Sequence, residues 1–217
     1  MMNEMLYIIF GWIMGILSTI CGTLLLEKIR QNINKNKITN GILVELNELL
    51  ITISATCYSL TYKYGKYNVK FLNWWKPYYY NIKSSGRLDI LSDNNKNIEK
   101  IFDMDETDLF KYKNANIEDP KKSKIIPPIS TPYIDTNLNF LAEYGEKYKQ
   151  QIFGIKREVN FLNNDISEVI FYHRKTFDDI STANHDIIVN NLNRLFTIMS
   201  RRTKDITELI NAFVQSY

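Results

Sequence analysis

The chain begins with an uninterrupted apolar segment. From Met5 to Leu26 there are 22 residues without a charged side chain. As a helix rising about 1.5 Å per residue, this segment would extend roughly 33 Å, enough to cross the hydrocarbon core of a bilayer. No positive charge precedes it and no A-x-A-like cleavage site follows it, which disfavours a cleaved signal peptide. The pattern predicts a transmembrane helix over residues 5–26, after a short tail at residues 1–4.

Beyond residue 40 the apolar positions follow a helical period in three places, which predicts three amphipathic helices. We expect the helices over residues 42–62, 138–179 and 183–215, the last two forming an antiparallel hairpin. The first apolar face comprises Ile42, Leu46, Leu49, Leu50, Ile53, Cys57 and Leu60. The second comprises Leu141, Tyr148, Ile152, Ile155, Val159, Leu162, Ile166 and Val169. The third comprises Ile188, Leu192, Leu195, Met199, Ile206, Leu209 and Phe213.

Less regular segments connect these helices. Residues 62–86 are rich in aromatic side chains, residues 87–124 indicate short helices and loops, and residues 120–134 form a proline-punctuated linker. The acidic stretch Asp103–Asp108 lacks the glycine and the closing glutamate of a calcium loop, so we interpret it as a helix start. The alternation of apolar and polar residues that is typical of β-strands never extends beyond a few residues. The predicted fold is therefore all-α, with a three- or four-helix bundle at residues 41–217, although the seams could instead pack between subunits as a coiled coil.

The charges flanking the apolar segment predict its orientation. One acidic and no basic side chain precede it, whereas Lys28, Arg30, Lys35 and Lys37 follow within a basic juxtamembrane stretch at residues 27–40. Under the positive-inside rule, the N-terminus lies outside and the rest of the chain lies in the cytoplasm. We therefore expect a single-pass protein of the inner membrane, in contact with membrane lipid.

The cysteine content agrees with this location. Cys21 and Cys57 are too few for a disulfide framework and fit a reducing compartment.

Small residues mark one face of the apolar segment. Gly11, Gly15, Ser18 and Gly22 follow each other at spacings of four, three and four residues, which places all four along one helix face. Small side chains allow helices to approach closely in lipid, where packing drives association. The stripe favours self-association into a homo-oligomer; glycine is also frequent in membrane helices for other reasons. Ser18, Thr19 and Thr23 either line a polar path or bond to their own helix, and the sequence leaves both open.

The aromatic segment has several interpretations. Its densest part contains Trp74, Trp75, Tyr78, Tyr79 and Tyr80. Such side chains pack into a core, anchor a protein partner, line a membrane interface or stack on nucleobases. We favour packing, followed by contact with a cytoplasmic protein partner. Nucleic acid is not an expected partner, because the formal net charge is only +3.

Little in the sequence supports catalysis. None of the common phosphate-binding, hydrolase, zinc or dithiol motifs is present, and the only histidines are His173 and His185. Neither has an upstream arginine at the R-x(4–6)-H spacing that a ribonuclease of the HEPN class requires, so a bundle of that shape would lack its catalytic motif. We expect no enzymatic activity, catalytic residue, cofactor or metal. Glu45 and Glu48 lie opposite the apolar face and are interpreted as solvated charges.

A buried charge site is predicted where the last two helices face each other. Arg202 occupies a seam position of the last helix, and His173 follows Val169 on the seam of the preceding one. A buried arginine needs a carboxylate partner or an anionic ligand, and Glu158, Asp165 or Glu168 could supply the carboxylate. We favour the ion pair, and a hydrogen-bonded interface role for His173.

The order of these features resembles a loose group of small bacterial single-pass membrane proteins. The resemblance rests on a Gly-Trp pair (Gly11-Trp12), a basic exit (Glu27-Lys28-Ile29-Arg30), an E-L-x-E-L helix (Glu45–Leu49) and an I-P-P linker (Ile126–Pro128). It covers most of the chain. Some members are components of phage defence, which implies an antiviral role. The arrangement is also similar in design to the membrane accessory protein of type VI-B CRISPR systems, which implies pore assembly. The histidine motif of that class is missing, and no site residue is carried over.

These observations favour a self-associating membrane protein. Its cytoplasmic bundle would bind a partner or sense a signal, and its membrane helix would respond, for example by perturbing the bilayer. The alternative is a membrane tether or scaffold that recruits a cytoplasmic protein through the aromatic segment or an exposed helical seam. A degenerate HEPN-like bundle is a further alternative.

Overall fold

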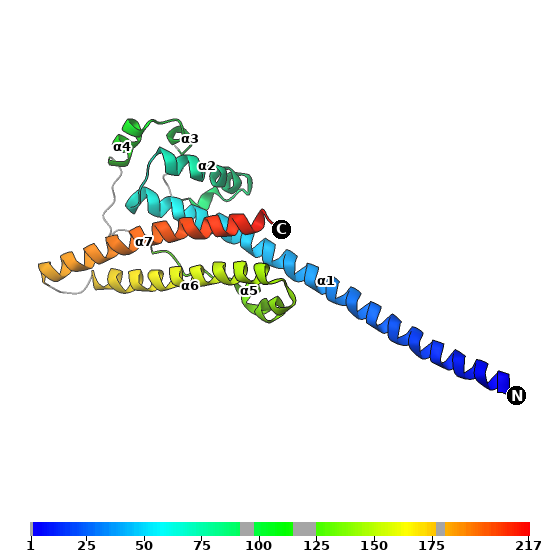
Figure 1. Cartoon of the computed structure of the whole chain (residues 1–217). Coiled ribbons are helices and arrows are strands. Elements are labelled where there is room, and N and C mark those ends of the chain that lie inside the picture. Colours follow the sequence, from blue (N-terminus) through cyan, green and yellow to red (C-terminus); the bar gives the residue numbers. More distant parts are fainter. Residues whose placement is uncertain (1, 92–97, 115–124, 177–180) are drawn as a thin grey trace. The chain divides into compact units, whose positions relative to one another are not determined.

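The structure, a computed structural model, describes residues 2–91, 98–114, 125–176 and 181–217 (Figure 1). The chain divides into two compact units, Met1–Leu43 and Val44–Tyr217. Helix is the only regular secondary structure among the described residues, which confirms the all-α class. Residues 120–124 of the expected linker, with Lys121, Lys122 and Lys124, lie outside the described ranges, as do residues 177–180.

The described helices follow each other in a fixed order along the chain. They are α1 (Met2–Tyr64), α2 (Val69–Ser84), the 3₁₀ helix η1 (Leu88–Ile90), α3 (Ile98–Ile101), α4 (Glu106–Asn114), α5 (Pro132–Asn137), the 3₁₀ helix η4 (Leu138–Glu143), α6 (Glu146–Lys175) and α7 (Thr182–Val214). α4 begins as expected at the acidic stretch, where Asp105 accepts a hydrogen bond of 2.8 Å from the Asp108 N–H. Ser181 caps α7 by accepting from the Asn184 N–H.

The first unit consists of helix α1 up to Leu43. α1 contains an apolar segment long enough to cross a membrane, by length and composition, and none of that segment's residues is buried in the structure. The Thr19 hydroxyl donates to the Gly15 carbonyl at 2.9 Å, and the Thr23 hydroxyl donates to the Thr19 carbonyl at 2.8 Å. Both threonines thus bond to their own helix, which is one of the two interpretations that the sequence leaves open.

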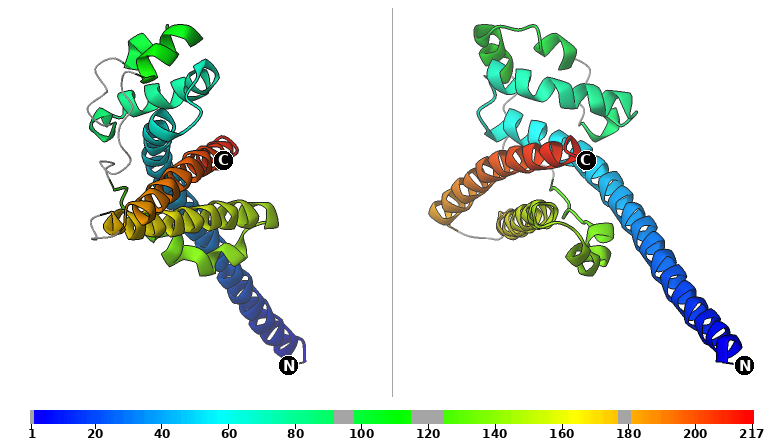
Figure 2. Two further views of the ribbon diagram at one scale, coloured as in Figure 1. Left: turned by 90° about the vertical axis from the view of Figure 1, so that its left-hand side faces the viewer. Right: turned by 45° about the vertical axis from the view of Figure 1, so that its right-hand side comes forward.

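The second unit has an aromatic core near the end of α1. The apolar face from Leu46 to Leu60 is buried, as predicted. Beyond it, α2, α3 and α4 lie together, as the views of Figures 1 and 2 show, and their apolar side chains form one cluster with the end of α1. Trp75 lies in this cluster with no exposed surface. Its ring stacks 4.1 Å from that of Tyr58, and its indole N–H donates to the Ser54 carbonyl at 2.9 Å.

α6 and α7 pack against each other in the same unit. Contacts join the start of α6 to the end of α7, where the rings of Tyr148 and Phe213 are 5.1 Å apart. All eight side chains of the predicted second seam are buried, which confirms that face. The helix itself begins at Glu146 rather than residue 138, because Leu138–Glu143 is a 3₁₀ helix and the backbone of Tyr144 and Gly145 is extended.

The third seam is buried as predicted from Leu192 to Phe213, with one exception at Leu209. Leu209, expected in the core, is 43% exposed, while Ile210 is fully buried. A straight α-helix drifts by about 20° per seven residues relative to a strict 3.5-residue repeat. At two slots the next residue along α7 is therefore buried instead, Thr203 after Arg202 and Ile210 after Leu209, while Ile206 and Phe213 stay in the core.

α1 and α7 approach closely where α1 ends. The hydroxyls of Thr61 and Ser200 are 2.8 Å apart and buried. A Cβ atom at Gly65 would lie 2.4 Å from the Ser200 hydroxyl oxygen and 2.8 Å from the backbone Cα of Thr61, so a larger residue would force α1 or α7 to shift. The contact fixes the end of α1 against α7.

Candidate functional site

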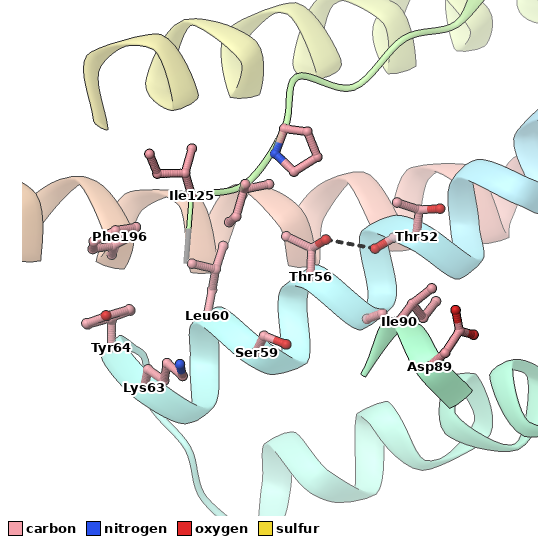
Figure 3. A pocket seen from close by; sticks show the side chains of 13 residues that line it. Thr52, Thr56, Ser59, Leu60, Lys63, Tyr64, Asp89, Ile90, Ile125 and Phe196 are labelled. Carbon is pink, nitrogen blue, oxygen red and sulfur yellow. Dashed lines mark hydrogen bonds between the residues drawn. The ribbon is translucent and has the colours of Figure 1, made fainter. Parts of the chain in front are cut away.

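A pocket of about 240 Å³ opens in the second unit beside the last turns of α1. Its walls come from α1, α7, η1 and the segment at residues 125–127, as Figure 3 shows. These elements are far apart in the sequence. No sequence motif marks the pocket, and only the fold brings its residues together.

One wall of the pocket is a polar row on α1. Thr52, Thr56, Ser59 and Lys63 recur at helical spacing, and Figure 3 shows their side chains along the helix. The Thr52 hydroxyl donates to the Glu48 carbonyl at 3.1 Å, and the Thr56 hydroxyl donates to the Thr52 carbonyl at 2.9 Å. With their hydrogens used in this way, both threonine oxygens offer acceptor lone pairs.

The remaining walls are mostly apolar. They consist of Ala55, Leu60, Tyr64, Ile90, Ile125, Ile126, Pro127 and Phe196. The rings of Tyr64 and Phe196 stack 4.4 Å apart at one end of the pocket. Ile125 is 41% exposed. An apolar pocket with a few polar groups is the usual form of a small-molecule site.

Two charged side chains lie at the pocket. Lys63 follows the polar row at the end of α1, and it has an interaction partner within the chain. Asp89 lies near the Thr52 end of the row, as Figure 3 shows, and is exposed. Among the residues that the structure describes, none donates a hydrogen bond to the Asp89 carboxylate or pairs with it. Within the described ranges, Asp89 is thus a negative charge of the pocket without a partner.

The segment that forms part of the pocket wall is held by side chains from α1 and α6. The Asn163 amide accepts from the Ile129 N–H and donates to the Ile129 carbonyl, both at 2.8 Å. The Lys156 ammonium donates to Thr131 and Asp135, both at 2.8 Å. These bonds fix residues 129–135 and thereby position the wall at residues 125–127.

Glu45 is the third side chain, after Asn163 and Lys156, that holds residues 129–135 in place. Its carboxylate accepts hydrogen bonds of 2.8 Å from the N–H groups of Tyr133 and Ile134, in the first turn of α5. Glu48 forms an ion pair with Arg87. The interpretation as a solvated charge is wrong for Glu45, which binds a distant helix start, whereas Glu48 is exposed as expected and pairs with Arg87 at the surface.

Replacing Glu45 with alanine is expected to lower the free energy of unfolding by about 1–2 kcal/mol, because two N–H groups at a helix start lose their acceptor. Chemical denaturation of the full-length protein in detergent micelles measures the loss. Glu48→Ala is the matched control. Its ion pair is exposed to solvent, so we expect a change of less than about 1 kcal/mol. Equal losses in the two variants would contradict the capping role.

Arg202 lies in an ion-pair cluster. Its Nε donates to Asp165 at 2.7 Å and its Nη1 donates to Glu158 at 3.2 Å, while the guanidinium lies 5.3 Å from the centre of the Phe161 ring. The two carboxylates are among the three that the sequence indicated. The ion pair that the sequence favoured is thus present, and it joins α6 to α7.

The predicted buried charge site needs two corrections. The Arg202 side chain is 25% exposed, so the cluster is only partly buried. His173 is half-buried and lies eight residues beyond Asp165 on α6, about 12 Å along the helix. His173 and Arg202 therefore do not form one site.

In the described part of the chain there is also no group of three or more His, Cys, Asp or Glu side chains that could hold a metal ion.

The structure separates the five aromatic residues proposed as an interface. Trp75 and Tyr79 are buried in the core, so they are not accessible to a partner. Trp74 and Tyr78 are half-buried, and the Lys204 ammonium lies 5.0 Å from the centre of the Trp74 ring. Only Tyr80 is exposed, at 48%. Most of this segment packs inside the protein.

A hydrogen-bonded charge pair lies at the edge of the aromatic core. Burial, and next the nearby Glu99 carboxylate, raises the pKa of Tyr79, whose hydroxyl donates to Glu99 at 3.2 Å. The Lys83 ammonium, 2.6 Å from the same oxygen, lowers the pKa of Glu99. Tyr79 therefore remains a neutral donor, and Glu99 remains ionised.

The small-residue face of α1 is uncovered in the first unit. Gly11, Gly15 and Ser18 are exposed, and Gly22 is half-exposed. Beyond the adjoining backbone of α1 itself, a Cβ atom at any of the three glycines would meet nothing within 4 Å. The face is thus free for a second helix.

Comparison with protein-family models, with curated proteins and with solved structures finds no match for this chain.

Proposed function

We propose that this chain is a single-pass inner-membrane protein that self-associates through its N-terminal helix, with its N-terminus outside and its antiparallel helical bundle in the cytoplasm. The exposure of the apolar N-terminal segment carries the proposal. Apolar side chains such as Phe10, Trp12 and Ile13 are at least half exposed, on different sides of α1. A helix that is apolar all round is stable inside a protein or inside a lipid bilayer.

The free small-residue face supports self-association. Gly11, Gly15, Ser18 and Gly22 leave room for a second backbone to approach, and the hydroxyls of Thr19 and Thr23 are already bonded within the helix. The lipid-facing helix therefore pairs by close packing rather than by exchange of hydrogen bonds.

A binding role, rather than catalysis, is proposed for the bundle. Arg202 pairs with two carboxylates, and the aromatic residues mostly pack in the core. The bundle would bind a partner or ligand, and the assembled membrane helices would perturb the bilayer in response, as a component of antiviral defence would. A tether that recruits a cytoplasmic protein is the alternative outcome of the test.

The mass of the full-length protein in mild detergent, measured by light scattering with correction for the micelle, tests the proposal. We expect a defined oligomer for the wild-type chain and monomers for Gly11→Leu combined with Gly15→Leu, because two leucine side chains separate the helices. Ile13→Leu combined with Ile20→Leu, on the opposite side of the helix, is the matched control and should leave the mass unchanged.

Two outcomes would count against self-association through this face. One is a glycine double variant with the wild-type mass. The other is a monomeric wild-type chain, which would favour the tether. In that case, a heterologous membrane anchor in place of residues 1–26 should preserve function.

A further inference from the structure

The pocket beside α1 has the size, the apolar walls and the access to solvent that a ligand site needs. Its volume of about 240 Å³ exceeds the roughly 150 Å³ of a cavity that holds benzene. Its walls are largely apolar, and Ile125 within them is 41% exposed to solvent. A ligand with an apolar body would remove this surface from water, which is the main source of affinity in such sites.

The polar groups of the pocket favour one sign of charge. Thr52 and Thr56 donate their hydroxyl hydrogens to backbone carbonyls and offer acceptors to a ligand. Asp89 adds a carboxylate that has no partner among the described residues. Lys63, the cation of the same pocket, already has a partner within the chain. Among the described lining residues, the groups without a partner are therefore hydrogen-bond acceptors, and Asp89 adds a negative charge.

We propose that this pocket binds a small amphipathic organic cation, with its apolar body between Leu60, Ile90 and Ile125 and its protonated amine at Asp89. The amine would donate to the Asp89 carboxylate and to the nearby threonine oxygens, and a charge-assisted hydrogen bond of this kind is stronger than a neutral one. The site is independent of the small-residue face of the membrane helix, so it stands apart from the proposed self-association.

A matched series of indole compounds tests the site. Tryptamine carries an amine that is protonated at neutral pH. Tryptophol replaces the amine with a neutral hydroxyl, and indole-3-propionate carries a carboxylate. Binding to the full-length protein in phosphatidylcholine nanodiscs is measured by ligand-observed NMR titration, with empty nanodiscs as the blank. Nanodiscs avoid detergent, which would compete for an apolar pocket.

We expect tryptamine to bind with a Kd of about 1 mM or tighter, as a ligand of this size allows. Its affinity should be about tenfold higher than that of tryptophol, because one charge-assisted hydrogen bond is lost in the alcohol. Asp89→Asn should reduce this preference to less than about twofold, since it removes the charge and keeps the shape. Asp103→Asn, an exposed aspartate outside the pocket, is the control and should change nothing. Circular dichroism checks that each variant is folded.

The Ser59→Phe variant tests whether the compounds bind in this pocket. Ser59 lines the pocket and makes no hydrogen bond within the described part of the chain, so a phenyl ring there fills the space without breaking a bond. This variant should abolish binding of all three compounds.

Three results would overturn the proposal. One is equal binding of tryptamine and tryptophol. Another is a preference for indole-3-propionate that Lys63→Gln removes, which would identify an anion site. The third is no binding above the blank by tryptamine or by the smaller phenethylamine. Because the titration does not depend on oligomeric state, none of these results bears on association of the membrane helix.

Discussion

Replacing Trp75 with alanine is expected to lower the free energy of unfolding of the full-length protein by about 3–5 kcal/mol. The side chain is completely buried, its ring stacks on Tyr58 at 4.1 Å, and its N–H donates to the Ser54 carbonyl at 2.9 Å. Alanine would leave a large cavity between α1 and α2 and remove both contacts. Urea denaturation in detergent micelles, followed by circular dichroism, measures the change.

Trp74→Ala is the control for this prediction. Trp74 precedes Trp75 on α2 but is only half-buried, and one face of its ring is covered by Lys204. We expect a loss of about 1–2 kcal/mol, because less surface leaves water when this residue folds. Similar losses for the two tryptophans would mean that Trp75 is not the centre of the aromatic core.

Replacing Arg202 with methionine is expected to destabilise the protein by about 2–3 kcal/mol. Methionine keeps much of the volume but leaves Glu158 and Asp165 without their cation, and both carboxylates are less than a quarter exposed. Removing one partner of a buried ion pair is costly because the remaining charge is not hydrated. The midpoint of urea denaturation measures the effect.

A triple variant separates charge from packing at this site. Combining Arg202→Met with Glu158→Gln and Asp165→Asn removes all three charges, and we expect it to regain most of the lost stability. If the triple variant is no more stable than Arg202→Met alone, the guanidinium acts through packing on Phe161, 5.3 Å away, rather than through its charge.

Most of the helices were predictable because each must bury one face. The buried positions of α6 and the face from Leu46 to Leu60 follow directly from apolar periodicity. The predictions were wrong at helix boundaries and at single core positions, which the apolar periodicity does not determine. Helix α6 starts after an extended backbone at Gly145, and the buried stripe of α7 moves from Leu209 to Ile210 because the helix is not bent to a 3.5-residue repeat.

The candidate site was less predictable than the helices. Arg202 was expected to find a carboxylate, because a charge in an apolar seam requires a partner. The pocket was not expected, since Thr52, Asp89, Ile125 and Phe196 meet only when four elements are assembled. Glu45 and Glu48 look like ordinary surface charges in a helical pattern, and a pattern does not report which distant group approaches.

The sequence by itself determined the class of this protein: an apolar N-terminal helix long enough to cross a membrane, followed by amphipathic helices. Those conclusions depend on interactions between near neighbours in the chain and on the burial of apolar side chains, which composition and spacing record. Only the tertiary structure decided that Trp75 and Tyr79 lie in the core, that Glu45 caps α5, and that Asp89 lies at a pocket with no partner in the part of the chain that the structure describes. These depend on contacts between residues distant in sequence, and such contacts exist only after the helices have packed.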